Sequence, residues 1–318
     1  MRLGPILLAA TMLISCMGDL PQGGIQIVTF NTQTLFDDVE DGDEFSPFTR
    51  AEGWNSTHYA QRLERLREAV RSSLDADIIF LQEVESDRVL DDLLDQSLRR
   101  RGYRYYCTAD DSSPISVGFI SKHKPLSVTV HGIGEERPIL RAEFLIDGNQ
   151  LTVYCLHAKS NLGDEDGNRA ARKDLASLLN SLVVDDAGPV VILGDFNSIP
   201  RADTLDMLAV VGALDSSSVL EASSLPVSHR REGLDGITFY DPMLDPLVPL
   251  GADGTYWYQG RWYDYDRVLL DDDALRAHPD FRVEIITWNN DNGFPEAYEG
   301  EGRWDGFSDH FPLRLCLR

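Results

Sequence analysis

An acid and an amide, Asp195 and Asn197, come directly after a strongly apolar run of the sequence. The run at 190–193 reads Val-Val-Ile-Leu, and β-branched residues in such a run are typical of a strand buried on both faces. On an extended chain, side chains two positions apart point to the same side. We therefore predict that Asp195 and Asn197 stand together at the rim of a sheet. A carboxylate beside a carboxamide at such a rim indicates a functional site, although Asp-x-Asn alone also occurs in many surface turns.

Polar residues also stand beside other strand-like runs of the sequence. In chain order these residues are Asn31, Glu83, His157, Asp195 with Asn197, Asp266, and Asp309 with His310. Taken singly, each has an ordinary structural explanation, as a turn former, a solubilising strand end or a hydrogen-bonded histidine at a rim. Their recurrence at strand after strand favours an active site built at the strand ends.

The rest of the sequence must supply the elements that position these residues. Apolar residues at helical spacing predict helices over 59–74, 90–98, 171–182 and, more briefly, 202–211. Apolar runs predict strands at 25–30, 76–84, 103–107, 115–121, 126–131, 139–146, 151–156, 189–193, 262–270 and 282–288. The segment 213–252 shows no clear organisation. The acidic segment 37–57 is expected to form a loop over one rim, where Phe45, Phe48 and Trp54 line a pocket or pack beneath the loop. Strands with helices between some of them fit a layered α/β architecture.

The ordered set of polar residues resembles the endonuclease/exonuclease/phosphatase family, the metal-dependent fold of deoxyribonuclease I. The matching motifs are Thr29-Phe30-Asn31, Leu81-Gln82-Glu83-Val84, His157-x-Lys159-Ser160, Gly194-Asp195-Phe196-Asn197, Tyr265-Asp266 and Ser308-Asp309-His310. The resemblance covers residues 25–318 and implies a single domain folded as a four-layer α/β/β/α sandwich. Arg267 departs from the pattern, because family members often carry histidine or tyrosine there, and this puts the local packing in question.

The resemblance implies a metal site that agrees with phosphoester chemistry. Attack of water on an anionic phosphoester requires neutralised charge and an oriented nucleophile. Mg²⁺ prefers oxygen ligands and retains several waters. We therefore expect Glu83 with Asn31 to bind Mg²⁺, with Mn²⁺ or Ca²⁺ as alternatives, and Asp309 to complete this site or hold a second ion.

The same resemblance assigns catalytic roles to five residues. Asp195 is expected to take a proton from the attacking water, and Asn197 to hold that water or a phosphoryl oxygen. His310 would contact the phosphate, and Asp266 would fix the tautomer of the imidazole by accepting its ring N–H. His157 would donate to a non-bridging or a leaving oxygen.

The first 16 residues are predicted to be a targeting segment. Arg2 precedes an apolar run at 3–14 that is too short to span a bilayer. The run ends in Leu-Ile-Ser-Cys at Cys16, which resembles the bacterial lipobox, where the cysteine is lipidated; the alternative is an ordinary secretory peptide with a chance cysteine. An exported lipoprotein of the cell envelope, anchored to the membrane without spanning it, is therefore expected. The predicted divisions are a signal peptide at 1–16, a tether at 17–24 and the family domain at 25–318.

Three further cysteines, Cys107, Cys155 and Cys316, lie in strand-like runs without C-x-x-C or zinc spacing. We expect them to be small buried hydrophobes, with one unassignable disulfide as the alternative.

The charge of the chain bears on the substrate. With 29 Lys and Arg against 53 Asp and Glu, the 318 residues carry a formal net charge of −24. This is the opposite of the basic face typical of nucleic-acid binding, although a bound divalent metal reverses the sign locally. Basic residues near the predicted rim are few: Arg137, Arg141, Lys159, Arg169 and Arg172. Surface pairing with acids is the ordinary explanation for all of them except Lys159, which stands beside His157.

The fold alone does not choose a substrate, because family members cleave DNA, RNA, sphingomyelin, inositol phosphates and other phosphoesters. We expect an exported, membrane-tethered metal-dependent phosphoesterase of the nuclease subtype. The alternatives are a phosphatase or a phospholipid or sphingomyelin phosphodiesterase on the same core, and, from a different class, a surface-binding lipoprotein without catalysis. No sequence feature points to a protein partner, and we expect a monomer.

Overall fold

A computed structural model of the chain describes residues 24–109, 113–132, 137–146, 148–200, 206–211, 223–234, 236–288, 293–298 and 306–318. The predicted signal peptide at 1–16 and most of the tether lie outside these residues. Among the described helices, none is both long and apolar enough to cross a membrane.

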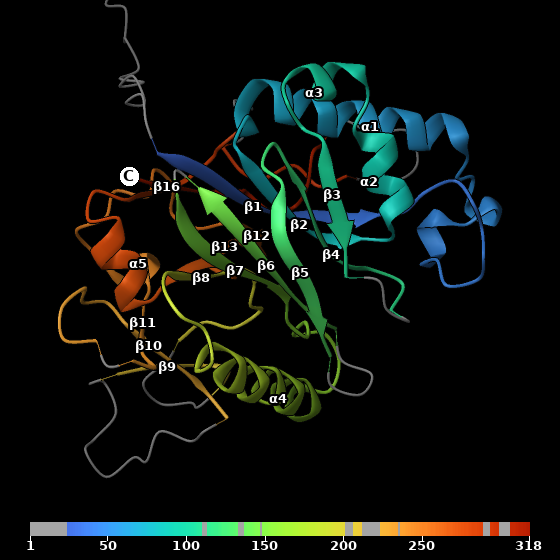
Figure 1. Cartoon of the computed structure of the whole chain (residues 1–318). Helices are drawn as coiled ribbons and strands as arrows, with labels where there is room; N and C mark the ends of the chain where they lie inside the picture. Colours follow the sequence, from blue (N-terminus) through green and yellow to red (C-terminus); the bar gives the residue numbers. More distant parts are fainter. Residues whose placement is uncertain are drawn as a thin grey trace, which may run out of the picture.

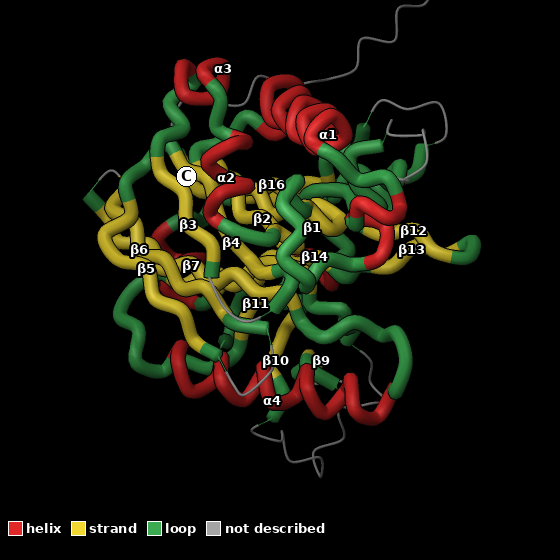
Figure 2. Tube along the Cα trace, turned by 90° about the vertical axis from the view of Figure 1, so that its right-hand side faces the viewer, coloured by secondary structure: helices red, strands yellow, loops and turns green. Residues whose placement is uncertain are grey.

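Two large β-sheets form the centre of the molecule (Figures 1 and 2). The first sheet, in spatial order, contains β15 (Arg282–Ile285), β16 (Leu313–Leu317), β1 (Ile25–Leu35), β2 (Ile78–Val84), β4 (Ser116–Ser121) and β3 (Tyr105–Thr108). The second contains β5 (Pro125–His131), β6 (Ile139–Ile146), β7 (Asn149–His157), β8 (Val190–Asp195), β14 (Asp266–Leu270), β11 (Phe239–Tyr240), β10 (Leu225–Ser228) and β9 (Leu208–Val210). Side chains from both sheets share one hydrophobic core, so the sheets pack face to face.

Helices cover the outer face of each sheet, which completes four layers (Figure 2). On one side lie α1 (Ser56–Ala69), α2 (Asp87–Leu93) and α3 (Gln96–Arg100), and on the other lies α4 (Glu165–Val183). The short helix α5 (Asp272–Ala277) follows β14, and a small separate hairpin is formed by β12 (Tyr256–Tyr258) and β13 (Arg261–Tyr263). The predicted α/β/β/α sandwich is therefore confirmed.

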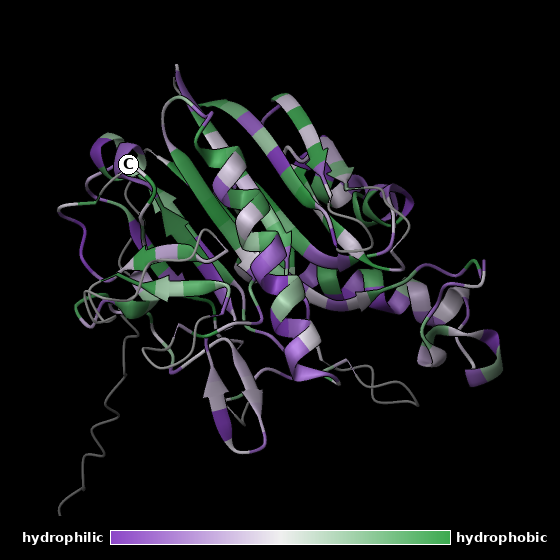
Figure 3. Cartoon of the chain, turned by 90° about the horizontal axis from the view of Figure 1, so that it is seen from below, coloured by the Kyte–Doolittle hydropathy of each residue, from purple (hydrophilic) through white to green (hydrophobic). Residues whose placement is uncertain are grey.

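The amphipathic pattern of the helices explains their positions. In α4, Ala171, Leu175 and Leu179 are buried against the second sheet, while charged residues lie between them. Figure 3 looks at α4 from outside: this helix alternates between hydrophobic and hydrophilic colours, whereas the central strands behind it are mostly hydrophobic. Asn55 begins α1 by accepting hydrogen bonds from the backbone N–H groups of Thr57 and His58. The helix predicted over 59–74 continues from α1 into a π-helical turn at Val70–Leu74.

Two helix predictions need correction. The helix predicted over 90–98 is broken between α2 and α3, because the Asp95 carboxylate accepts from the N–H groups of Ser97 and Leu98 and so starts a new helix. The helix predicted over 202–211 is wrong where the structure describes it, since Leu208–Val210 forms the edge strand β9 and pairs with β10. Residues 202–205 lie outside the described residues.

Other parts of the chain support the core without entering the site. Phe48 and Trp54 are buried and their rings pack together, so these two aromatic residues of the 37–57 loop pack beneath it, whereas Phe45 is exposed. Arg99 and Arg101, near the end of α3, pair with aspartates of neighbouring elements. Cys155 and Cys316 are buried, as expected of small hydrophobes, whereas Cys107 is only partly buried. Arg267, the departure from the family pattern, is buried and paired with the buried Asp241.

Candidate active site

The site lies at one end of the two central sheets, and strand pairing explains how distant residues meet there. β7 and β8 run parallel, with His157 paired to Asp195, and β14 runs antiparallel to β8, with Asp266 paired to Asp195. Asp266 therefore begins its strand where β8 ends. In the other sheet, β1 and β2 are parallel and Asn31 is paired with Gln82, one residue before Glu83.

Unusual backbone conformations bring three of the site segments close together. Gly194 has a φ of 133°, and a Cβ atom there would lie 2.0 Å from the carbonyl oxygen of Leu156, so only glycine fits beside β7. Glu83 and Asn197 have φ values of 64° and 47°, in the left-handed region that non-glycine residues seldom adopt. Asn197 thus reaches the site through a tight turn after Asp195, rather than by the extended chain that the sequence suggested.

Asp195 is buried, and groups from three segments hold it in place. One carboxylate oxygen accepts from the Asn31 amide at 3.0 Å, and the other accepts from the backbone N–H of Asn197 at 2.9 Å. Burial and the nearby charge of Asp266 raise the pKa of Asp195 to about 7, although His310 and these hydrogen bonds oppose the rise. A carboxylate with this pKa can accept a proton near neutral pH.

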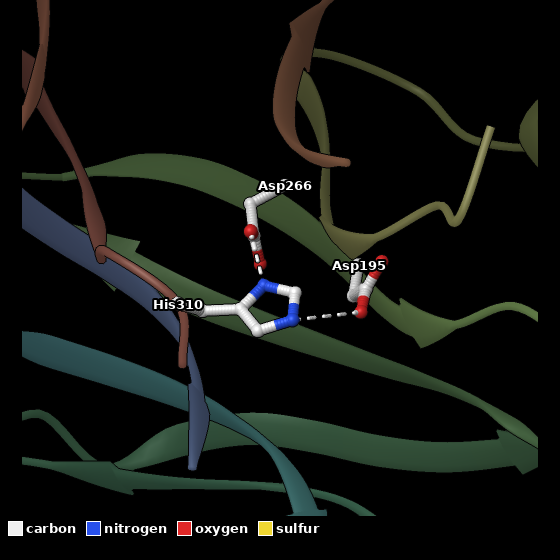
Figure 4. A group of neighbouring side chains, drawn as sticks. All are labelled: Asp195, Asp266 and His310. Carbon is white, nitrogen blue, oxygen red and sulfur yellow. Dashed lines mark hydrogen bonds and ion pairs between the residues drawn. The ribbon is translucent and has the colours of Figure 1, made fainter. Parts of the chain in front are cut away.

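His310 stands between two aspartates (Figure 4). Its Nδ1 hydrogen-bonds the carboxylate of Asp266 at 2.7 Å, and its Nε2 lies 4.0 Å from Asp195 Oδ2 on the other side. Burial disfavours the charged ring, but the charge and hydrogen bond of Asp266, with the charges of Asp309 and Asp195, raise the pKa of His310 to about 10. The ring is therefore an imidazolium at neutral pH, and its Nε2–H faces the centre of the site.

Glu83 lies on the opposite side of Asp195, next to Asn31. Its carboxylate accepts from the Asn31 amide at 3.1 Å and from the backbone N–H of Thr34 at 2.7 Å. A carboxylate can only accept hydrogen bonds, so Asn31 must turn its NH₂ group towards Glu83 and Asp195. Its Oδ1 accepts from the backbone N–H of Gln33 at 2.9 Å. In this arrangement Asn31 orients two acids, and its role as a metal ligand stays a prediction.

The acids of this half of the site fit a hard divalent cation. Burial and the nearby like charge of Asp309 raise the pKa of Glu83, although the Asn31 amide and the charges of Arg137 and His310 oppose the rise. The side chains of Glu83 and Asp309 are 18% and 33% exposed, which leaves space for the waters that Mg²⁺ keeps. Asp195, Asp266 and His310 also converge closely enough to bind a metal ion. The structure therefore offers two groups of acids to a divalent ion, and the assignment of the ion to Glu83 and Asp309 stays a prediction.

His157 is buried, and its protonation state differs from that of His310. Arg137 lies 2.7 Å from its Nε2, and because a guanidinium can only donate, Nε2 must be the unprotonated acceptor. Burial and the positive charges of Arg137 and His310 hold the pKa of His157 well below its usual 6.5. The ring is thus neutral, and it is 3.6 Å from Glu83 and 3.8 Å from Asp195.

The structure brings the eight predicted site residues into one contiguous group, whose catalytic and metal-binding roles stay predictions. Asn197 meets the group through its backbone, and its amide donates to the Ala158 carbonyl at 3.1 Å. Sequence reasoning set Arg137 aside as a surface cation, yet it contacts His157 inside the site. In the sequence, the feature that could have pointed to this contact is the position of Arg137 just before the strand β6. By contrast, ion pairs with acidic side chains are formed by Arg141, Arg169 and Arg172, as the sequence analysis expected of ordinary basic residues.

Comparison with known proteins agrees with this geometry. A model of the endonuclease/exonuclease/phosphatase family matches residues 26–318. The chain belongs to this family. It is therefore a metal-dependent hydrolase of phosphoester bonds. No curated protein matches the sequence.

Solved structures of this endonuclease/exonuclease/phosphatase fold resemble the chain at low identity. Beta toxin of Staphylococcus aureus, in a mutant form with bound magnesium ions, is 14% identical with a TM-score of 0.60, covering 93% of this chain and 100% of the toxin. D. rerio TDP2 in complex with a single-strand DNA product is 16% identical with a TM-score of 0.55, covering 92% and 98%. SmcL is 15% identical with a TM-score of 0.54, covering 93% and 99%. At these identities the likeness shows the shared fold.

Proposed function

We propose that this endonuclease/exonuclease/phosphatase protein is an exported, membrane-tethered nuclease that hydrolyses phosphodiester bonds by attack of water. The observation that carries the hydrolytic part is the line formed by Asp266, His310 and Asp195 (Figure 4). It places a cationic donor beside a carboxylate whose pKa is about 7. The cationic ring of His310 can stabilise negative charge on a phosphoryl oxygen. The carboxylate of Asp195 can accept a proton from a water molecule.

In the proposed mechanism, Asp195 accepts a proton from the water that attacks phosphorus. Asn31 and the Asn197 N–H hold its two oxygens, so the carboxylate is oriented before the substrate arrives. The Nε2–H of His310 donates to a phosphoryl oxygen. Asp266 keeps the ring protonated and, by binding Nδ1, holds it in the orientation that this donation needs.

Mg²⁺ is the proposed cofactor, with Mn²⁺ or Ca²⁺ as alternatives, held by Glu83 and Asp309 with Asn31 nearby. When bound, such an ion neutralises phosphoryl charge. The chemistry of two neighbouring carboxylates supports this choice, as does the magnesium bound by the S. aureus toxin of the same fold.

His157 and Arg137 are proposed to act as a pair. His157 was expected to donate to a phosphate oxygen, but in this arrangement its Nε2 accepts from Arg137. The guanidinium retains further N–H groups for an anion. We therefore assign the donation to Arg137, with His157 positioning it.

A DNA or RNA substrate is supported by the single-strand DNA product bound to D. rerio TDP2, which shares the fold. Hydrolysis of DNA, RNA, a phosphomonoester and a sphingomyelin vesicle should be compared in Mg²⁺, Mn²⁺ and Ca²⁺. We expect cleavage of nucleic acid that EDTA abolishes. Because the chain carries a charge of −24, this cleavage should persist or improve from low to moderate salt. Uncut DNA and RNA beside a hydrolysed monoester or lipid would reject the nuclease and leave the phosphoesterase.

Export and tethering rest on the Leu-Ile-Ser-Cys sequence that ends at Cys16. We propose that Cys16 is acylated and anchors the protein to the cell envelope. Cys16→Ala should release the protein from the membrane fraction and remove the lipid seen by mass spectrometry. A wild-type protein that is unacylated and found only in the soluble fraction would contradict this assignment.

A further inference from the structure

A cavity opens beside the proposed catalytic group, and none of the roles above uses it. Its volume is about 390 Å³, and its walls include Asn161, Arg169, Asn197, Ser198, Tyr263 and Tyr265. Asn197 belongs to the turn that holds Asp195, so the cavity adjoins the place where a phosphoester would bind. A substituent of the substrate's phosphate could therefore enter it.

A ladder of stacked aromatic rings connects the cavity with His310. The ring of Tyr256 packs on His310 with 4.6 Å between centroids, Tyr265 stacks on Tyr256 at 5.6 Å, and Tyr263 stacks on Tyr265 at 5.2 Å. The interplanar angles along this ladder are 30°, 30° and 24°, so the rings are nearly parallel. Tyr263 and Tyr265 are half-buried and line the cavity. Their position offers flat aromatic surface to a flat ligand.

Two residues of the cavity wall carry buried polar atoms that lack a hydrogen-bond partner among the described residues. They are the hydroxyl of Ser198, a residue only 3% exposed, and Nε of Arg169. Buried polar groups are normally hydrogen-bonded, and leaving one unpaired costs about 1–3 kcal/mol. Two such groups in one wall indicate a site built for a polar ligand.

The rest of the wall supports a neutral ligand with hydrogen-bonding edges. The Asn161 amide donates to the backbone carbonyl of Asn197 at 2.8 Å and also bonds Tyr265, which leaves its Oδ1 as an acceptor. Arg172 is buried and paired with Asp206 at 2.7 Å. Arg169 and Arg172 line the cavity together with Glu165 and Asp206, the acids with which they pair, so the wall has no net charge that would favour an ionic ligand.

We propose that this cavity binds a nucleobase of the substrate, stacked on Tyr263 and Tyr265, with Ser198 and Asn161 hydrogen-bonding its edge. This inference rests on the proposed nuclease function and names the part of a nucleic acid that the site would recognise. A quaternary ammonium headgroup is the other group that aromatic rings attract, and it is the poorer fit because it has no hydrogen-bonding atom for the unpartnered Ser198 hydroxyl.

The test compares two ligands that differ only in the base. Deoxyadenosine 5′-monophosphate and 2-deoxyribose 5-phosphate are titrated into the protein with Mg²⁺, and the dissociation constants are measured by calorimetry. Stacking of one base on an aromatic side chain should tighten binding about 5- to 150-fold. Tyr263→Leu should reduce this gain to within about 2-fold. Ser198→Ala, which removes one atom, should weaken nucleotide binding about 2- to 10-fold.

Tyr258→Leu is the matched control. Tyr258 stacks on Tyr256 from the hairpin but does not line the cavity, so the gain should be retained. Equal affinity for the two ligands, or a gain that survives both cavity variants, would overturn the inference. Tighter binding of phosphorylcholine than of the nucleotide would overturn it too. Because the readout is binding, it is distinct from the nuclease assay: a protein that cuts DNA without preferring the base-bearing ligand refutes this subsite alone.

Discussion

The charge state of His310 should depend chiefly on one of its three acidic neighbours, and Asp266→Asn tests this directly. Asp266 hydrogen-bonds the ring at 2.7 Å, and both residues are buried. The pKa of about 10 lies roughly 3.5 units above the usual 6.5, equivalent to about 5 kcal/mol in favour of the imidazolium. An opposite charge within a few ångströms moves a pKa by about 1–3 units, and the short hydrogen bond of Asp266 places its effect at the upper end, about 2–3 units. The substitution should therefore lower the pKa of His310 to about 7–8.

The consequence for catalysis follows from the sign of this shift. His310 acts in its protonated form, so the rate should fall as pH rises through its pKa. In the wild-type protein the alkaline limb of the pH–rate profile should lie near pH 10, and in Asp266→Asn it should move to about pH 7–8. The maximal rate should also drop about 10²–10⁴-fold, because the asparagine no longer fixes the charged ring. Titration of the His310 ring followed by NMR measures the same pKa independently of turnover.

Asp264→Asn provides the control for this experiment. Asp264 lies on the same segment and is a half-buried acid with a raised pKa, yet the opposite charge that acts on it is Arg267. This variant should leave the His310 titration near pH 10. If the ring of Asp266→Asn still titrates near pH 10, another charge maintains the imidazolium and the reasoning above is refuted.

Four further predictions follow from the same geometry. Asp195→Asn should lower the rate at least about 10²-fold and remove the acidic limb near pH 7 from the pH–rate profile, with circular dichroism confirming the fold; a retained limb would assign it to another group. Glu83→Gln should raise the metal concentration needed for half-maximal rate, measured by Mg²⁺ titration, whereas an unchanged titration would place the ion elsewhere. Arg137→Gln should raise KM for phosphoesters in steady-state kinetics, because a phosphate donor is lost, and an unchanged KM would return that role to His157. Burial raises the pKa of Asp271 from 3.8 to about 6, so its contribution to stability is complete below pH 3.8 and is lost as pH rises through 6; Asp271→Asn should remove about 1 kcal/mol of this pH dependence in urea unfolding, and an unchanged pH dependence would assign it to another group.

Local patterns were enough to predict much of the fold. Two apolar runs form buried strands, at 190–193 and at 78–84. A strand inside a sheet removes the side chains of a continuous apolar run from water on both faces. The helix at 59–74 and the helix containing Leu175 and Leu179 follow from spacing along one face. Both kinds of signal depend on residues close together in the chain.

The same local reasoning failed where a single hydrogen bond or a distant strand decides the outcome. Asp95 breaks a continuous apolar spacing because its carboxylate caps a new helix. Leu208–Val210 forms a strand because it pairs with β10. The spacing of apolar residues along the chain contains no information about that pairing.

The sequence by itself was enough to predict a phosphoesterase core, because acids, amides and imidazoles follow its strands in the order Asn31, Glu83, His157, Asp195, Asp266 and His310. Only the tertiary structure decided how these residues differ in their protonation states. His157 and His310 are the same residue type, yet Arg137 makes one neutral and Asp266 makes the other cationic. The tyrosine ladder is likewise assembled from β12, β13 and the turn before β14. Charge and stacking depend on distances across the fold, and residue order along the chain does not contain those distances.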